Sequence, residues 1–148
     1  MEIGLPNDFK DFLRLLDAER VEYLLIGGYA VAYHGYPRAT EDIDIWVASK
    51  PENARRIVKS LRSFGFDVPE LSEDLFLKPD SIVRMGVPPL RIELSTTIAG
   101  VQFDECYKNR ITETIDGIKV SLINLPDLKR NKKATGRFRD LDDLERLP

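Results

Sequence analysis

The sequence contains a single cysteine, Cys106, and a single histidine, His34. One cysteine excludes an internal disulfide and any metal site built from several cysteines. No segment approaches the roughly 20 consecutive apolar residues that a membrane-spanning helix needs. The first residues (MEIGLP) have neither the basic start nor the apolar core of a signal peptide. We therefore expect a cytoplasmic protein that does not enter a membrane.

The 148 residues are ordinary for a globular protein, since 43% are hydrophobic and 32% are charged. No repeat or long linker divides the chain, so we predict a single domain over residues 1–148. The net charge of −3 argues against extensive RNA contact. Six basic residues nevertheless crowd together near the C-terminus: Lys129, Arg130, Lys132, Lys133, Arg137 and Arg139. This pattern fits a solvated helix face, a site for an anion such as phosphate, or a site that binds a short stretch of nucleic-acid backbone.

Hydrophobic periodicity predicts helices that alternate with short strands. The expected helices begin at Asn7 or Asp8, at Gly27, at Pro51, at Phe103 and at Pro126, with a break near Gly136 and amphipathic turns over 138–147. The expected strands are 21–26, 41–47, 75–77, 81–85 and 90–94, with a hairpin of 111–115 and 118–123 around Asp116-Gly117. We therefore predict an α+β fold, in which helices pack on a small mixed sheet.

Two aspartates stand one residue apart in the strand expected over 41–47. Alternate side chains of a strand project from the same face, so the Cα atoms of Asp42 and Asp44 should lie roughly 6.5 Å apart. Two carboxylates at that distance repel each other unless a positive charge lies between them. A hard divalent cation such as Mg²⁺ meets this need. The plainer interpretation is that both acids lie on the wet face of a half-buried strand.

Two glycines, Gly27 and Gly28, stand where the first expected strand turns into a helix. Without side chains, they let backbone N–H groups approach a ligand closely. The N-terminal end of the following helix favours phosphate oxygens. The alternative is a tight strand-to-helix turn with no ligand. On adjacent strands, the glycines and the aspartates would place an anion cradle opposite a metal-binding pair, as nucleotidyl transfer from a triphosphate requires.

The order of these motifs resembles that of the DNA polymerase beta-like nucleotidyltransferase superfamily. The resemblance is carried by "LIGGYAVAYHG", "RATEDIDIWV" and "LRIELST", the last of which supplies a third carboxylate, Glu93. The closing "LKRNKKATGRFRDLDDLERL" is similar to the end of minimal prokaryotic nucleotidyltransferases, including abortive-infection and toxin–antitoxin types. The resemblance runs over nearly the whole chain from Leu24 and implies the polymerase beta-like fold.

The resemblance implies a role for each motif residue. Asp42, Asp44 and Glu93 would bind two Mg²⁺ ions, with Mn²⁺ as the alternative, and Glu93 would orient or deprotonate the acceptor hydroxyl. Gly27 and Gly28 would hold the phosphates of a nucleoside triphosphate such as ATP. The remaining substrate-binding candidates are Arg38, Thr40, Lys133 and Arg137. Two departures are that Gly28 replaces the serine of many members and that Glu93 replaces the commoner aspartate.

The resemblance leaves the acceptor open: it could be the 3′ end of a tRNA, a protein side chain or a small molecule. A catalytically impaired module that binds a nucleotide or a partner is the alternative to an enzyme, because the chain is short and carries Glu93. Half of a toxin–antitoxin pair is compatible with either. A small helical partner protein or a second copy of the chain could close the open side of the cleft.

Overall fold

The computed structural model describes residues 4–40, 42–86 and 91–148. Glu41 and Leu90, with which two predicted strands begin, lie outside the described residues. The helices are α1 (Asn7–Ala18), α2 (Gly27–Tyr33), α3 (Pro51–Phe64), α4 (Phe103–Lys108), α5 (Leu125–Thr135) and α6 (Phe138–Arg146), with a 3-10 helix, η1 (Glu73–Phe76). The strands are β1 (Tyr23–Ile26), β2 (Asp42–Val47), β3 (Ile82–Met85), β4 (Arg91–Ser95), β5 (Ile111–Ile115) and β6 (Ile118–Leu122).

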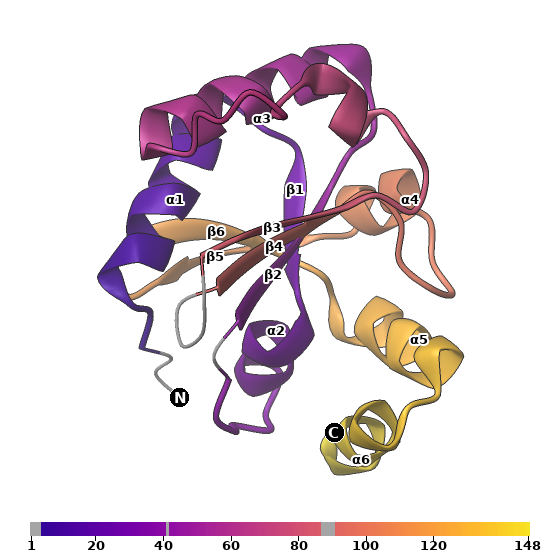
Figure 1. The fold of residues 1–148 in the computed structure, drawn as a ribbon. Coiled ribbons are helices and arrows are strands. Elements are labelled where there is room, and N and C mark those ends of the chain that lie inside the picture. The colour runs from indigo at the N-terminus through magenta and orange to yellow at the C-terminus, as the bar shows by residue number, and fades with distance from the viewer. Residues whose placement is uncertain (1–3, 41, 87–90) are drawn as a thin grey trace.

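The described strands form one six-stranded sheet in the order β3-β4-β2-β1-β6-β5 (Figure 1). β1 pairs antiparallel with β2 and parallel with β6, and β2 pairs parallel with β4. The edge strands β3 and β5 each pair antiparallel with their neighbour. The sheet is mixed, so the predicted α+β fold is confirmed.

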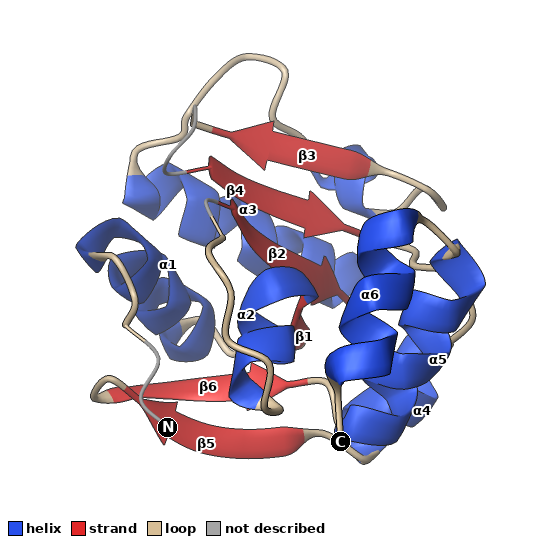
Figure 2. Ribbon diagram, turned by 90° about the horizontal axis from the view of Figure 1, so that it is seen from below, coloured by secondary structure: helices blue, strands red, loops and turns tan. Residues whose placement is uncertain are grey.

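Helices cover both faces of the sheet. α1 and α3 lie on one face, and α2, α5 and α6 lie on the other (Figures 1 and 2). The alternation of β2 follows this division, because Ile43 and Ile45 belong to the core cluster with α1 and α3. Trp46 belongs to the second cluster, with residues of α2, α5 and α6's C-terminal neighbour Leu147. Asp42 and Asp44 therefore face the same side as Trp46.

Local signals in the sequence explain most element boundaries. Pro51 occupies the first turn of α3, and Gly65 ends that helix in the left-handed region with φ 107°. Asp116 and Gly117 both have positive φ, 52° and 81°, as a two-residue hairpin turn requires. His34 caps the C-terminal end of α2, and its ring Nε2 lies 2.8 Å from the carbonyl oxygen of Ile123.

One predicted strand is wrong. Residues 75–77 do not extend a sheet; they overlap the 3-10 helix η1 and its C-terminal cap. Phe76 is fully buried there, whereas Leu77 is 38% exposed. A three-residue apolar run is too short for its period to distinguish a strand from a helical turn. Among the described helices, none combines the length and the apolar character needed to cross a bilayer.

Candidate functional site

Three carboxylates share one face at the centre of the sheet; we call Asp42, Asp44 and Glu93 the strand carboxylates. Asp44 on β2 lies directly opposite Glu93 on β4 in the parallel register of these strands. Asp42 is two residues earlier on β2 and opposite Arg91. Residues opposite one another in a sheet project from the same face, so the backbone gathers all three acids beneath α2 and α6.

Two of the strand carboxylates are paired with arginines. Arg91 Nη2 lies 2.7 Å from Asp42 Oδ2, and Arg84 Nε on β3 lies 2.9 Å from Glu93 Oε2. Within residues 4–40, 42–86 and 91–148, no three acidic, histidine or cysteine side chains converge closely enough to hold a metal ion. The backbone therefore aligns the acids, while the side chains of Asp42 and Glu93 turn toward cations of the protein.

Asp44 is the acid whose negative charge is least compensated. Burial, and then the negative charges of Glu93 and Asp42, raise the pKa of Asp44 to about 6, against the opposing effects of Lys132 and Arg91. A carboxyl group in this setting gains from any additional cation. Hard oxygen donors that repel each other are the ligand set of Mg²⁺ and Mn²⁺, so the chemistry of the strand carboxylates fits a divalent metal.

The glycine turn touches the strand carboxylates directly. Gly27 has φ 67°, and a Cβ added there would stand 2.2 Å from Asp44 Oδ2. A Cβ added at Gly28 would stand 2.7 Å from Thr40 Oγ1. Both positions therefore require glycine, the first for its backbone conformation and its contact with Asp44. The glycine turn therefore lies against Asp44 and Thr40.

The loop between α2 and β2 carries the other two early candidates. Thr40 donates its hydroxyl to the carbonyl oxygen of Asp42 at 3.1 Å, so it fixes the start of β2. Arg38 does not reach the strand carboxylates. Its guanidinium donates two hydrogen bonds of 2.9 Å to the two carboxylate oxygens of Asp143 on α6. Arg38 therefore ties this loop to the C-terminal helices.

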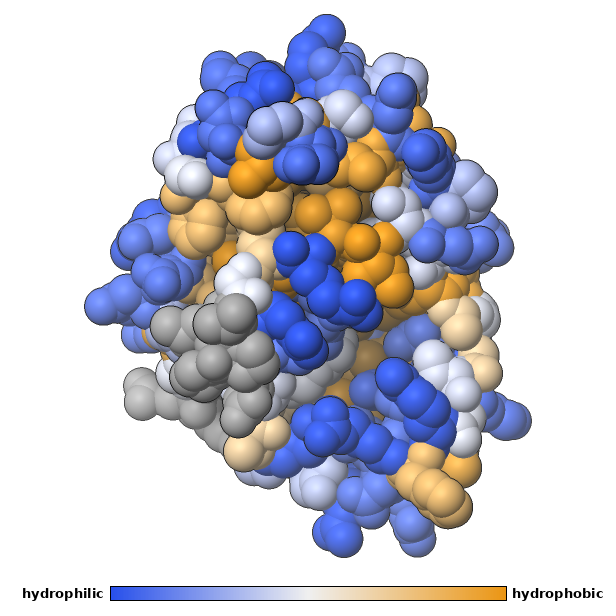
Figure 3. Space-filling model, in the orientation of Figure 1, coloured by the Kyte–Doolittle hydropathy of each residue, from blue (hydrophilic) through white to orange (hydrophobic). Residues whose placement is uncertain are grey.

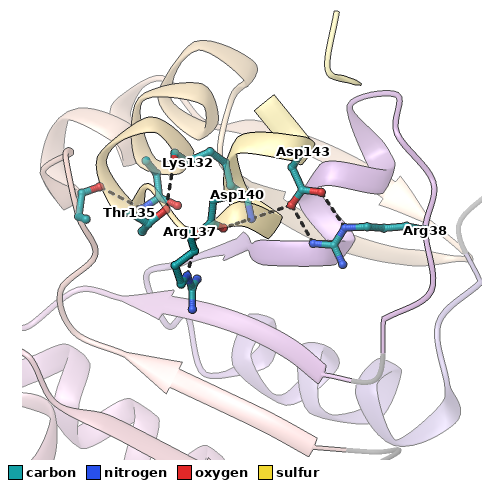
Figure 4. Close-up of polar contacts among 8 residues, drawn as sticks. Arg38, Lys132, Thr135, Arg137, Asp140 and Asp143 are labelled. Carbon is teal, nitrogen blue, oxygen red and sulfur yellow. Dashed lines mark hydrogen bonds and ion pairs between the residues drawn. The ribbon is translucent and has the colours of Figure 1, made fainter. Parts of the chain in front are cut away.

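A network of charged side chains, three of them buried, joins α5 to α6, and we call Arg38, Lys132, Arg137, Asp140 and Asp143 the hairpin cluster (Figure 4). Lys132 Nζ lies 3.1 Å from Asp140 Oδ1 and 3.1 Å from Asp143 Oδ2. Arg137 Nε lies 2.7 Å from Asp140 Oδ2. The side chains of Lys132, Asp140 and Asp143 are at most 6% exposed, so each buried acid has at least two cationic partners.

Hydrogen bonding dominates the titration of this cluster. Burial by itself would raise the pKa of Asp140, but hydrogen bonds from Arg137, Thr135 and Lys132 outweigh it and lower the pKa to about 2. The pKa of Asp143 is likewise lowered, because Arg38 and Lys132 outweigh its burial. Both groups are therefore carboxylates at neutral pH.

The predicted basic cluster divides into separate environments. Arg137 is bound to Asp140 but keeps 75% of its side chain exposed, and Figure 4 shows its guanidinium turned away from α6 toward the strands. The pKa of Arg137 is raised, mainly by its hydrogen bond to Asp140. The negative charges of Asp44 and Glu93 raise it further. Lys133 is exposed beside it. Figure 3 shows hydrophilic side chains gathered around a hollow on the lower half of this face.

Two cations of the site, Arg84 and Arg91, were not predicted from the sequence, and Lys132 was predicted only as a member of the basic cluster. Arg91 could have been found, since it stands two residues before Glu93 in the same expected strand and must share its face. Lys132 follows Leu128 and Asn131 at helical spacing, and all three are buried. That spacing marks the inner face of α5. Arg84 depends on the β3–β4 register, which has no local signal.

Comparisons with known proteins bear on the family and the fold of the chain. Residues 7–147 match the model of a family described as "Nucleotidyltransferase of unknown function (DUF6036)". A solved structure assigned as a nucleotidyltransferase of Thermotoga maritima is 17% identical, with a TM-score of 0.64 over 93% of this chain and 88% of that one. An antigenic nucleotidyltransferase-like protein of Paracoccidioides brasiliensis is 21% identical, with a TM-score of 0.54 over 93% and 72%. No curated protein matches the sequence. The predicted fold is thereby confirmed.

Proposed function

Because the chain belongs to the family described as Nucleotidyltransferase of unknown function (DUF6036), we propose that it transfers a nucleoside monophosphate from a nucleoside triphosphate to a hydroxyl acceptor. A nucleotide is the substrate class of any nucleotidyltransferase. In the proposed reaction the acceptor oxygen bonds to the α-phosphorus, the bond from that phosphorus to the bridging oxygen breaks, and pyrophosphate leaves. The acceptor proton passes to a carboxylate or to water.

One observation carries the proposal: the contact between Gly27 and Asp44. A single added carbon at Gly27 would stand 2.2 Å from Asp44 Oδ2. The turn that offers backbone N–H groups to phosphates is therefore adjacent to an acid with unsatisfied negative charge. A triphosphate needs both kinds of group within reach, one for its oxygens and one for its counter-ions.

The residues divide the work as follows. The N–H groups of Gly27 and Gly28 bind the β- and γ-phosphates, and Thr40 holds β2 in position behind them. Arg137, whose planar fork matches phosphate, neutralises charge from the α5–α6 side together with Lys133. Glu93 orients the acceptor hydroxyl or takes its proton. Asp42, Asp44 and Glu93 would hold two Mg²⁺ ions, or Mn²⁺, which when bound neutralise the triphosphate and lower the pKa of the hydroxyl.

A labelling experiment tests the activity. The protein is incubated with the four α-labelled triphosphates, Mg²⁺ and a cell extract, and transferred label is counted. We expect transfer by the wild type, loss of transfer in the Asp42→Ala, Asp44→Ala double variant, and unchanged transfer in Asp67→Ala, which removes an exposed acid elsewhere. Label that does not depend on Asp42 and Asp44, or no transferred label at all, contradicts the proposal.

A glycine pair offers a matched test of the phosphate cradle. Gly27 and Gly65 both have positive φ, but a Cβ at Gly65 meets no atom within 4 Å. Alanine at either position therefore carries the backbone strain, and only Gly27→Ala also displaces Asp44. We expect calorimetry to show weaker triphosphate binding for Gly27→Ala and unchanged binding for Gly65→Ala. Equal triphosphate affinities of the two variants would show that Gly27 does not contribute to the phosphate-binding site.

A second candidate function is a module that binds a nucleotide without transferring it. The observation that favours it is the pairing of Asp42 with Arg91 and of Glu93 with Arg84, because internal cations occupy positions that metals would need. Calorimetry separates the two candidates. Tight triphosphate binding without label transfer supports the module, whereas the absence of binding removes it. A role in a toxin–antitoxin pair is compatible with both.

A further inference from the structure

The bend between α5 and α6 exposes an aromatic side chain. Phe138, the first residue of α6, is 94% exposed, compared with 49% for Ile82 and 44% for Leu141. Gly136 turns the chain sharply here, with φ 67°. A phenyl ring held in water is unfavourable by about 25 cal/mol for each Å² of apolar surface. Packing on the rest of the protein therefore does not explain Phe138.

Cationic residues neighbour Phe138 in the sequence. Arg137 precedes it, Arg139 follows it, and Lys133 stands near the end of α5; all three are exposed. Among the described residues, no carboxylate lies within ion-pair distance of Lys133 or Arg139. Figure 3 shows apolar side chains protruding between hydrophilic ones at the lower right, over the α5–α6 region. The bend thus combines an exposed ring with uncompensated positive charge, on a chain whose net charge is −3.

This bend stands beside the strand carboxylates. Arg137 is the residue before Phe138, and its guanidinium points toward the strands (Figure 4). The charges of Asp44 and Glu93 contribute to its raised pKa, after the larger effect of Asp140. The hairpin cluster also fixes the bend, because Lys132 and Arg38 hold Asp140 and Asp143 of α6 in place. A ligand on Phe138 would therefore be held on a fixed helix, one residue from an arginine that faces the strand carboxylates.

We propose that Phe138 and Arg139 form the acceptor platform, which binds the 3′ end of a single-stranded polynucleotide. This inference rests on the proposed function. A base stacks on the Phe138 ring, Arg139 and Lys133 contact phosphodiester groups, and Arg137 remains turned to the triphosphate. The 3′-oxygen then bonds to the α-phosphorus, pyrophosphate leaves, and the polynucleotide becomes one nucleotide longer.

The surroundings of Phe138 favour a polynucleotide over a protein partner. A protein interface needs a contiguous apolar core, whereas beyond Phe138 and the half-exposed Leu141 the exposed residues of α6 are charged: Arg139, Asp142, Glu145 and Arg146. A single ring between cations suits a nucleobase, since every base has a face that stacks and a phosphate that pairs. Asp142 and Glu145, one and two turns further along α6, repel phosphates and confine the platform to the bend.

Binding is measured by fluorescence anisotropy with end-labelled 12-nucleotide single strands of RNA and of DNA and with a duplex. We expect Phe138→Ala to weaken single-strand binding by about 5- to 150-fold, the range of one base–aromatic stack, and Phe138→Trp to preserve it. Ile82→Ala, which removes an exposed apolar side chain from the edge strand β3, should leave the affinity unchanged. Circular dichroism verifies that each variant is folded.

The salt dependence tests the charged part of the platform. Arg139→Ala should reduce the slope of log affinity against log salt by about 0.7, the value for one phosphate contact on a single strand. Arg55→Ala, at an exposed arginine of α3, is the control that should keep the wild-type slope. An unchanged slope in Arg139→Ala, or duplex bound as tightly as the single strand, would overturn the platform.

The platform and the proposed function can fail separately. If the Asp42→Ala, Asp44→Ala variant loses label transfer while Phe138→Ala binds and labels oligonucleotides as the wild type does, the activity stands and the platform is wrong. If size-exclusion chromatography shows a dimer that Phe138→Ala dissociates, the ring contacts a second copy and the platform is wrong. If oligonucleotides bind through Phe138 but no triphosphate binds, the proposed function is wrong.

Discussion

The molecule contains two groups of acids whose electrostatics are opposite. In the hairpin cluster, Asp140 and Asp143 are almost completely buried, yet hydrogen bonds from cations lower their pKa values. Among the strand carboxylates, Asp44 is also largely buried, but two neighbouring acids help to raise its pKa to about 6. Burial is common to both groups, so the supply of cations decides the direction. The hairpin acids are satisfied within the protein, whereas Asp44 is suited to a cation from outside.

The largest expected effect comes from removing the central cation of the hairpin cluster. Lys132→Met leaves Asp140 and Asp143 buried with fewer partners, and the loss of one member of a buried ion pair typically costs about 3–5 kcal/mol. Urea unfolding followed by the fluorescence of the buried Trp46 measures the free energy of unfolding. Lys133→Met is the matched control and should change it by no more than about 0.5 kcal/mol. Equal stability of the two variants would contradict the structural role of the cluster.

Neutralising Asp44 should have the opposite sign. The folded pKa of Asp44 is about 6 and its ordinary value is 3.8. The charged form is therefore disfavoured in the fold, and the stability of the wild type falls as the pH rises from about 4 to 6. Asp44→Asn should stabilise the protein by about 3 kcal/mol at pH 7.5 in the absence of divalent metal. The difference should vanish below pH 4.

Unfolding curves at pH 3.5, 5 and 7.5 measure this effect, with the exposed Asp67→Asn as control. Saturating Mg²⁺ should reduce the advantage of Asp44→Asn, because a ligand bound to the native state stabilises the wild type. If Asp44→Asn is less stable than the wild type at pH 7.5, the charge of Asp44 is already compensated by partners within the protein. The contrast with the hairpin acids would then disappear.

Asp140 should show the reverse pH dependence. Its folded pKa is about 2, below the ordinary 3.8, so its ionised form stabilises the fold above pH 4 and this contribution is lost as the pH falls toward 2. Asp140→Asn should lower the free energy of unfolding by about 2 kcal/mol at pH 7, with a smaller difference at pH 3. Urea unfolding at both pH values measures it. A deficit that does not shrink in acid would assign the effect to packing.

The smallest effect is expected at Arg91. The side chains of its ion pair with Asp42 are about one-third exposed. Arg91→Met should therefore lower the melting temperature less than Lys132→Met or Asp140→Asn does. The same substitution removes a cation that competes for the strand carboxylates, and Mg²⁺ binding measured by calorimetry should become tighter. Weaker Mg²⁺ binding in Arg91→Met would mean that Arg91 organises the acids instead of competing with a metal.

The sequence predicted the elements of this fold where the local physics was strong. α3 begins at Pro51 and ends before Gly65, the turn between β5 and β6 is Asp116-Gly117, and β1 ends before Gly27. Each of these residues has a backbone preference of its own. The error at residues 75–77 arose where no such residue stands and where Phe76 is buried by tertiary packing alone.

The candidate site was predictable in its backbone and less so in its side chains. Alternation along β2 placed Asp42 and Asp44 on one face, as the structure has them. The partners of Asp42 and Glu93 could not be derived, because they depend on strand register. From the sequence, Arg38 could pair either with the strand carboxylates or with the acids of the hairpin cluster. Only the tertiary arrangement directs it to Asp143. Charge composition likewise does not reveal that Lys132 is buried and Lys133 exposed.

The parallel pairing of β2 with β4 limits how the chain can vary in length. Asp44 and Glu93 are neighbours because they are register partners, each at a position of its strand that projects from the same face of the sheet. One residue inserted between Arg91 and Glu93 would send the acid to the opposite face, against α1 and α3. Insertions between α3 and β3 leave that register intact. Natural relatives should therefore differ in length around η1 and keep β4 free of gaps, which an alignment of family members would reveal.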